Sequence, residues 1–337
     1  MSNRVPLSIL DLVSVSEGQD AGEAIGHAME AAVLADRLGY ERLWYAEHHN
    51  TEAVASAATQ VLIGRAAGLT SRIRVGSGGV MLPNHAPLMV AEQYGTLAQL
   101  FPGRIDLGLG RAPGTDRMTA HALNRTSADP QAFAEAVWDL VGWFSGGRSH
   151  SINIEAGVAA GTNVPIWVLG STTSGASIAG QLGLPFSIAA HFAPDQVEDA
   201  IAVYRQMFTT DAPTSQISEP RVMVGVNVLV AETDEEAQFQ FSTHQQMFLS
   251  VRRGTRHKLL PPVPVAKVGS VSEVQALDSM LRVRAVGSPE TVRRGLESLV
   301  ERTGADELIT TTYTYDPAVR LESIRLLAEA WGLEATS

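Results

Sequence analysis

Two adjacent histidines and a carboxylate stand directly after a short apolar run in the stretch WYAEHHN, residues 44–50. An imidazole titrates near neutral pH, so His48 or His49 could act as a general base, and Glu47 could orient it. Because adjacent residues of an extended chain point to opposite sides, the two histidines are expected to serve different tasks. A metal site is not expected, since the chain has no cysteine and no H-E-x-x-H pattern to complete a usual zinc ligand set.

Glycines surround an arginine in GRIDLGLGRAPGTD, residues 103–116. The dinucleotide-binding fingerprint would need a glycine where Pro113 stands, so this stretch is not a Rossmann turn. Glycines still let the backbone approach a flat or phosphorylated ligand, and the planar fork of Arg111 can grip a phosphate. The alternative is a tight loop with a surface arginine.

A strand, a glycine, four hydroxyl residues and a helix start follow one another in VLGSTTSGASIAGQLGLP, residues 168–185. Ala176 stands where a P-loop needs its lysine, which argues against hydrolysis of a nucleoside triphosphate. Hydroxyl groups and the free N–H groups of a helix start still favour phosphate binding, although an ordinary Ser/Thr helix cap is the alternative. The residues expected to bind the phosphate are Gly170, Ser171, Thr172, Ser174 and Gly175.

Two further glycines, Gly78 and Gly79, fall inside an apolar run that is typical of a buried strand. Glycine weakens a strand and often marks a bulge or a place where a ligand lies close to the backbone. We therefore expect a flat ligand to lie against this pair.

The elements that must position these residues alternate between strands and helices along the chain. Strands are predicted at 5–10, 42–46, 73–80, 104–110, 165–170, 185–190, 222–231 and 307–312. Helices are predicted at 20–39, 55–69, 87–100, 129–145, 174–182, 194–208, 233–250, 289–303 and 317–332, the first of them ending at Gly39. This alternation favours an α/β fold, a closed (β/α)8 TIM barrel, over an open doubly wound sheet. In such a barrel the chemistry lies at the carboxyl ends of the strands, where all four motifs fall.

Composition places further limits on the function. The chain of 337 residues is 45% hydrophobic and 18% charged, as expected for a globular protein, and we expect a single domain over residues 1–337. Its formal net charge of −11 argues against general nucleic-acid binding. No apolar run suits a membrane span and the N-terminus does not resemble a signal peptide, so a cytoplasmic location is expected.

Taken together, WYAEHHN, the segment from Gly78 to Asp116 and the 168–185 stretch resemble the bacterial luciferase-like flavin monooxygenases over nearly the whole chain. The resemblance implies FMN as cofactor, reduced by a separate NAD(P)H:flavin reductase. It implies reaction of the flavin C4a atom with O2 to a hydroperoxide that oxidises a small organic substrate. It also implies a homodimer formed through the early helices, and small residues such as Ala57, Ala58, Ala66, Ala67 and Ala98 would permit close packing there.

The same resemblance assigns roles to particular residues. It implies that His48 is the general base and that Glu47 and His49 support it. Arg111 would bind the FMN phosphate together with Ser171, Thr172 and the amides near Ser174 and Gly175. Gly78 and Gly79 match the pair at which the family often has a non-prolyl cis peptide against the flavin ring. His85 and His191 would lie near the substrate, and the segment 251–287 matches a lid over the flavin, with a static excursion as the alternative.

At two positions this chain differs from related groups of proteins, and these differences bear on light emission and on the cofactor. Gly110 stands where light-emitting members have a cysteine, so light emission is not implied. Glu47 stands where deazaflavin-dependent members usually have an aspartate, which favours FMN. The alternatives are a deazaflavin- or flavin-dependent hydride-transfer reductase, a non-catalytic flavin-binding protein and a metal-dependent barrel hydrolase.

Overall fold

Eight parallel strands form the closed barrel predicted from the sequence, in a computed structural model that describes residues 4–112, 114–123 and 129–335. The strands are β1 (Leu7–Asp11), β2 (Arg42–Tyr45), β3 (Arg74–Met81), β4 (Ile105–Gly110), β5 (Ile166–Gly170), β6 (Phe186–Ile188), β7 (Val222–Val230) and β9 (Glu307–Thr311). Neighbours pair in the order β6, β5, β4, β3, β2, β1, β9, β7, and a further pairing of β6 with β7 closes the barrel.

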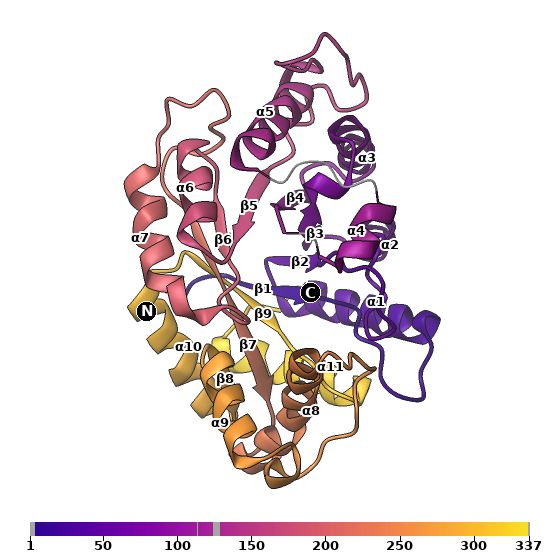
Figure 1. Cartoon of the computed structure of the whole chain (residues 1–337), viewed down its shortest axis with the longest axis vertical. Helices are drawn as coiled ribbons and strands as arrows, with labels where there is room; N and C mark the ends of the chain where they lie inside the picture. The colour runs from indigo at the N-terminus through magenta and orange to yellow at the C-terminus, as the bar shows by residue number, and fades with distance from the viewer. Residues whose placement is uncertain (1–3, 113, 124–128, 336–337) are drawn as a thin grey trace.

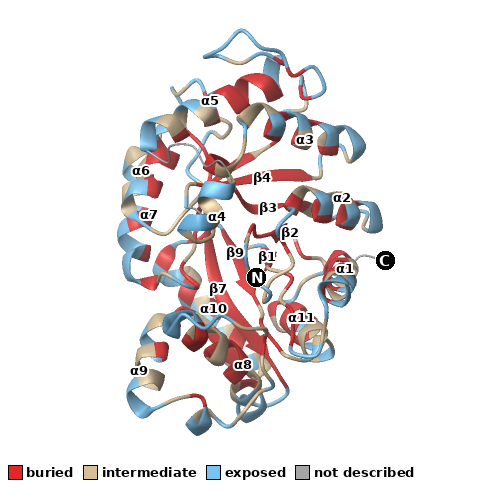
Figure 2. Ribbon diagram, turned by 45° about the vertical axis from the view of Figure 1, so that its right-hand side comes forward, coloured by how far each residue is buried: buried red, intermediate tan, exposed pale blue. Residues whose placement is uncertain are grey.

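Helices surround the strands, with α6 and α7 along one side of the barrel and α1 and α2 along the other (Figure 1). They are α1 (Ala21–Leu38), α2 (Thr59–Leu69), α3 (Pro87–Leu100), α4 (Arg117–Ala122), α5 (Pro130–Gly146), α6 (Thr173–Gln181), α7 (Val197–Met207), α8 (Asp234–Arg253), α9 (Val271–Met280), α10 (Pro289–Thr303) and α11 (Pro317–Trp331). Figure 2 shows buried strands and helices with one buried and one exposed face. None of the helices in the described ranges combines the length and apolar character of a membrane span.

The segment 251–287, the lid candidate of the sequence analysis, contains regular structure of its own. It includes α9 and a ninth strand, β8 (Arg284–Gly287). The nine residues of β7 pair with β9 over Met223–Asn227, and β8 pairs with Asn227–Val230, so β8 lies outside the barrel ring. The segment thus lies between β7 and β9 of the ring, with α9 and β8 as its regular elements, and its role as an insertion that acts as a lid stays a prediction.

Hydrogen bonds fasten the beginning of this segment to the loop that follows β1. The amide of Leu259 donates to the carbonyl of Val15 over 2.9 Å, and the amide of Glu17 donates to the carbonyl of Leu259 over 2.8 Å. The side chain of Thr243 in α8 donates to the carbonyl of Leu260 over 3.0 Å. The segment therefore packs on the carboxyl-end face of the barrel, and its opening as a lid stays a prediction.

Local signals define several helix ends. Helix α1 ends at Gly39, as predicted, where φ is 89° and glycine is therefore favoured. Helix α3 begins at Pro87, whose fixed φ suits the first turn. Helix α2 begins at Thr59, four residues later than predicted, because the preceding chain folds back on β2 and the hydroxyl of Ser56 donates to the carbonyl of Ala46 over 2.5 Å.

A buried ionic network fills the amino-terminal end of the barrel. Arg42 donates through Nη1 to Oδ2 of Asp106 and through Nε to Oε1 of Glu307, each over 2.6 Å. Asp106 also accepts from Arg74. Burial alone would raise the pKa of Asp106, but the charges of Arg42 and Arg74 outweigh it and hold that pKa below its usual value. The network closes this end, so the opposite end is the one available to a ligand.

An apolar layer lies above the network. Trp44 and Trp167 meet edge to face, with ring centroids 5.6 Å apart. The cluster also contains Leu10, Ala46, Met223 and Ile309. Along β2 the interior side chains therefore run from Arg42 through Trp44 to Ala46, and the next residue on the chain begins the candidate site.

Candidate active site

The carboxylate of Glu47 is the centre of a hydrogen-bonded cluster at the carboxyl end of β2. Its Oε1 accepts from Nε2 of His49 over 2.9 Å, and its Oε2 accepts from Nε2 of His85 over 2.8 Å. The amide of Met81 also donates to Oε2 over 3.0 Å, and the side chain of Asn84 donates to Oε1 over 3.2 Å. The β2 and β3 exits are therefore joined through one buried anion.

This arrangement keeps Glu47 ionised. Burial alone would raise its pKa, but the hydrogen bonds and charge of His85, the hydrogen bond of His49 and the amide of Met81 together lower the pKa below its usual value. The cluster thus holds a fixed negative charge beside two imidazoles at neutral pH.

His48 lies beside this cluster but takes no part in its hydrogen bonding. Within the described part of the chain, no hydrogen bond joins its ring to Glu47, which holds His49 and His85 instead. Burial lowers the pKa of His48; the charge of Glu47 opposes this, and the charges of Arg256 and His49 add to it. The neighbouring histidines differ as expected, since one is tied to a carboxylate and the other is a neutral imidazole.

A wall of closely spaced backbone stands next to the cluster, on β3 and β4. The peptide bond between Gly78 and Gly79 is cis, the geometry that the resemblance implied for this pair. The pairing of β3 with β4 shifts register between Gly78 and Val80, which is the predicted bulge. A Cβ added at Gly79 would lie 2.7 Å from the carbonyl oxygen of Gly108, so no larger side chain fits there. A Cβ added at Gly78 would lie 2.6 Å from Cδ1 of Leu10, so both positions of the cis peptide require glycine.

The phosphate-site candidate lies at the next strand exit, between β5 and α6. Helix α6 begins after Thr172, which makes no side-chain capping hydrogen bond. Nη2 of Arg111, in the loop after β4, donates to the hydroxyl of Ser174 over 3.3 Å. A helix start of this kind offers N–H groups and the positive end of the helix dipole. Pro113, in the same loop as Arg111, lies outside the described residues.

The remaining candidates divide between two sides of the barrel mouth. His85 joins the Glu47 cluster, whereas His191 follows β6 on the side formed by β6, β7 and β9. Gly170 and Gly175 approach closely, because a Cβ added at either would lie 3.4 Å from the Cα of the other. Ser171 precedes the start of α6 at the same corner.

Sequence reasoning missed two residues of this region. Asn84 binds Glu47, and His244 is a buried imidazole on α8. A single histidine within a helix carries no local signal of a site, and the contact of Asn84 depends on a partner 37 positions away.

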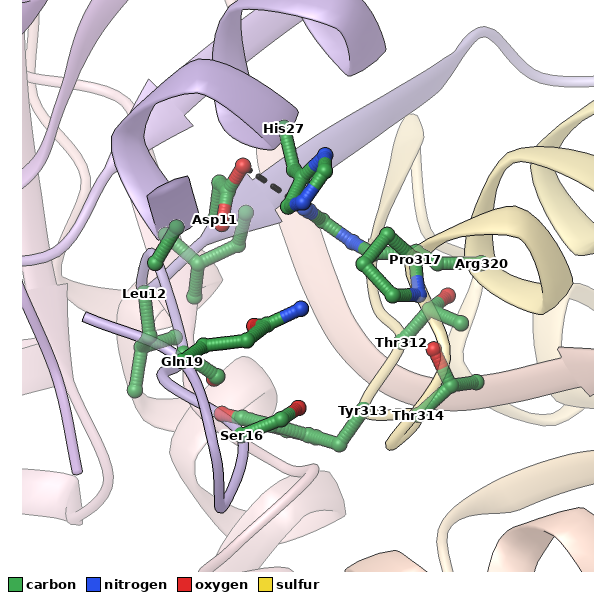
Figure 3. Close-up of a pocket in the computed structure, with 13 residues that line it drawn as sticks. Asp11, Leu12, Ser16, Gln19, His27, Thr312, Tyr313, Thr314, Pro317 and Arg320 are labelled. Atoms are coloured by element: carbon green, nitrogen blue, oxygen red, sulfur yellow. Dashed lines mark ion pairs between the residues drawn. The ribbon is translucent and has the colours of Figure 1, made fainter. Parts of the chain in front are cut away.

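A cleft opens on the same face between the loops after β1 and β9 (Figure 3). Asp11 and Arg320 form an ion pair of 2.8 Å across it, and Ser16, Gln19 and Thr314 line it. Its volume of about 30 Å³ is room for one or two water molecules. The cleft is too small for a flavin or an organic substrate.

Comparison with known proteins finds a family match and relatives that extend over most of the chain. Residues 5–307 match the family described as luciferase-like monooxygenase. A luciferase-like monooxygenase of Escherichia coli (strain K12) is 44% identical over 324 residues, 96% of each chain. An N-acetyl-S-alkylcysteine monooxygenase of Bacillus subtilis (strain 168) is 33% identical over 257 residues, 75% of each chain.

Solved structures share the same architecture. Crystalline apo-MsnO8 is 34% identical and superposes with a TM-score of 0.87 over 98% of this chain and 100% of its own. The oxygenating constituent of 3,6-diketocamphane monooxygenase from Pseudomonas putida, solved with FMN, is 19% identical, with a TM-score of 0.73 over 99% of this chain and 100% of its own. An F420-dependent secondary alcohol dehydrogenase is 13% identical, with a TM-score of 0.69 over 96% and 99%. The last two likenesses show the fold alone.

Proposed function

The chain belongs to the luciferase-like monooxygenase family, and we propose that it uses reduced FMN and O2 to oxidise a small organic molecule. The observation that carries the proposal is the contact of Arg111 with Ser174, which joins side chains 63 positions apart at the start of α6. FMN bears a phosphate, and such a corner suits a phosphate. The FMN bound by a structural neighbour of the same fold supports this choice of cofactor.

The residues present fit FMN in a second respect. Gly78 and Gly79 form the cis peptide and the bulge of this wall, and a flat ring system would lie against the backbone there. When bound there, reduced FMN would supply the electrons for the activation of O2.

The side chains at the β2 exit would hold and move protons beside that wall. Glu47 would fix the rings of His49 and His85 through the bonds to its two oxygens. His48, neutral at pH 7 because of its lowered pKa, would take up a proton at a ring nitrogen and later return it. The segment 251–287 would exclude water from the mouth.

Two partners belong to the same proposal. A separate NAD(P)H:flavin reductase would supply reduced FMN, and two copies of the chain would form a homodimer. The alternative, hydride transfer from a reduced deazaflavin without O2, is supported by the fold that the chain shares with an F420-dependent dehydrogenase.

The test supplies reduced FMN through a generic flavin reductase, isotopically labelled O2 and a panel of ketones, aldehydes and thioethers. We expect a labelled oxygen atom in the product of at least one substrate, and none when the protein is left out. Turnover that proceeds equally well without O2 would instead support the hydride-transfer alternative. Failure to bind reduced FMN would overturn the choice of cofactor.

A further inference from the structure

The thioether of Met81 lies where the carboxyl ends of β3 and β4 meet the Glu47 cluster. Met81 is the last residue of β3, and its amide donates to Oε2 of Glu47 over 3.0 Å. A Cβ added at Gly110, the last residue of β4, would lie 2.8 Å from Sδ of Met81. A Cβ added at Gly114 would lie 3.0 Å from its Cγ. The side chain of Met81 therefore lies against the loop that carries Arg111.

Glycine leaves room for this side chain in the loop. At Gly114 φ is 61°, a conformation that favours glycine, and Gly110 gives Sδ a neighbour without a side chain. Met81 is half-buried, whereas Met223 in the apolar layer beneath the mouth is 0% exposed. Solvent and small molecules can therefore reach part of the Met81 side chain, but not that of Met223.

The sulfur of Met81 is the atom of this region that a peroxide oxidises most readily. A thioether takes up one oxygen atom to become a sulfoxide, and the chain has no cysteine that could react instead. Reduced FMN that meets O2 without an organic substrate returns oxidised FMN and hydrogen peroxide, since two electrons and two protons pass to O2. A lone pair of the sulfur then attacks one peroxide oxygen. The S–O bond forms, the O–O bond breaks, the sulfur loses two electrons, and the second oxygen leaves with both protons as water.

We propose that Met81 is a modification site, oxidised to its sulfoxide by peroxide that forms at the barrel mouth when no substrate is present. The inference rests on the proposed function, because the reaction of reduced FMN with O2 supplies the peroxide. The modification limits the reaction that causes it. A sulfoxide oxygen is polar, so the anion of Glu47 repels it and the packing of the thioether against Gly110 is lost. The loop that carries Arg111 shifts, FMN binds more weakly, and less peroxide forms.

Peptide mass spectrometry of the full chain tests the proposal through the gain of one oxygen atom at each methionine. One sample is kept in air with FMN, NADH and a generic flavin reductase, without organic substrate. It contains catalase, which removes peroxide from the bulk solution but is too large to enter the mouth. A reference sample contains added hydrogen peroxide and neither flavin nor catalase.

Two other methionines serve as controls within the same chain. Met207, the last residue of α7, is half-buried like Met81, but α7 runs back from the carboxyl end of β6 towards the opposite end of the barrel. Met118 on α4 is 83% exposed. In the reference sample we expect Met118 to be oxidised fastest, because oxidation follows exposure. With reduced FMN and catalase, the ratio of sulfoxide at Met81 to that at Met207 should rise by about tenfold or more, because proximity raises the effective concentration of peroxide at the mouth.

A variant connects the modification to flavin binding. After the incubation with reduced FMN, the FMN affinity of the parent chain should fall by about tenfold, which corresponds to the loss of one charge-assisted hydrogen bond. Treatment with methionine sulfoxide reductases should restore it. Met81→Leu keeps the volume of the side chain and removes the sulfur, so its FMN affinity should be the same before and after the incubation. The matched control Met207→Leu should lose affinity as the parent chain does.

Equal sulfoxide at Met81 and Met207 in the sample with reduced FMN and catalase would overturn the proposal, as would an FMN affinity that is unchanged once Met81 is oxidised. The same samples report on the proposed reaction through FMN binding and O2 uptake. Bound FMN and O2 uptake with an unmodified Met81 would overturn this inference alone. Failure to bind reduced FMN would overturn the proposed reaction and this inference with it.

Discussion

At the scale of single residues, the β2 exit separates two kinds of imidazole. Glu47 anchors His49 and His85, so those rings are held in place by a buried charge. His48 stays outside this network, and burial lowers its pKa, so its imidazole is uncharged at neutral pH. A group of this kind is suited to accept a proton, whereas the anchored rings are suited to shape the pocket.

We predict that His48→Ala lowers turnover by about 10²–10⁴, the usual range for a general acid or base, and leaves FMN affinity largely unchanged. The measurement is substrate oxidation under reduced FMN, with FMN affinity determined on the same samples. His121→Ala, at an exposed position of α4, is the matched control and should retain activity. Full activity of His48→Ala would show that His48 takes no part in the reaction.

The buried pair His191 and His244 makes stability depend on pH. Their folded pKa values of about 4 and about 3 lie below the value of about 6.5 expected in the unfolded chain. Below pH 6.5 the unfolded chain therefore binds protons that the folded chain does not, so stability is lost as pH falls from about 6.5 towards 4. Each histidine contributes a slope of up to about 1.4 kcal/mol per pH unit in this window.

We predict that lowering the pH from about 7 to about 5 decreases the free energy of unfolding of the parent chain more than that of His244→Phe. The difference between the two decreases should be about 1–2 kcal/mol, because the variant lacks the histidine that the unfolded chain protonates. The comparison is made by urea unfolding at both pH values, with His121→Gln at an exposed position of α4 as control. If the difference in free energy of unfolding between His244→Phe and the parent chain is the same at both pH values, His244 is protonated at pH 5 in the folded chain as it is in the unfolded chain.

At the scale of elements, the loop after β4 and the start of α6 form one corner. We predict that Arg111→Ala weakens FMN binding by about 1.5–3 kcal/mol, the size of a charge-assisted hydrogen bond. Riboflavin, which lacks the phosphate, should bind the parent and the variant equally well. Arg117→Ala, at an exposed position of α4, is the control. If the loss for riboflavin matched the loss for FMN, Arg111 would not contact the phosphate.

The elements also show what a sequence can predict. The ends of α1 and α3 depend on Gly39 and Pro87, which act locally, and both were predicted correctly. Helix α4 has six residues and β8 has four, too few for a periodic pattern, and both were missed. In the candidate site, the spacing drew attention to Glu47 and its neighbours. Its contact with His85 bridges 38 positions, and only the closed barrel creates it.

At the scale of the whole molecule, the buried ions at the amino-terminal end hold distant strands together. Arg42 on β2 bonds Asp106 on β4 and Glu307 on β9. We predict that Arg42→Met lowers the free energy of unfolding by about 3–5 kcal/mol, because two buried carboxylates lose their main partner. Arg325→Met, which breaks only exposed pairs on α11, should cost no more than about 1 kcal/mol. Equal losses in urea unfolding would contradict this account of the network.

We also predict a homodimer, but the structure changes the side chains that we expect at its interface. Ala66 and Ala67, which we expected to permit close packing of partners, are buried against the barrel. The most exposed large apolar side chains of these helices are instead Val61 on α2 and Met89 and Leu100 on α3, which are 71%, 57% and 64% exposed. We propose that these side chains contribute to the interface of the dimer.

We predict a dimer mass by light scattering at low micromolar concentration, and a monomer mass for the double variant Val61→Glu, Leu100→Glu, because burying two charges opposes association. Val271→Glu, an equally exposed change on α9, should leave the dimer intact. A monomer mass for the parent chain would contradict the prediction.

In the proposed function, this barrel mouth directs the reaction of reduced FMN with O2. Rapid mixing of the protein, loaded with reduced FMN in the absence of substrate, with O2 tests it most directly through time-resolved absorption spectra. We expect a transient spectrum that differs from those of both reduced and oxidised FMN, and that decays faster in the His48→Ala variant. Conversion from reduced to oxidised FMN in one phase, with the spectra and rate of free flavin, would contradict the claim.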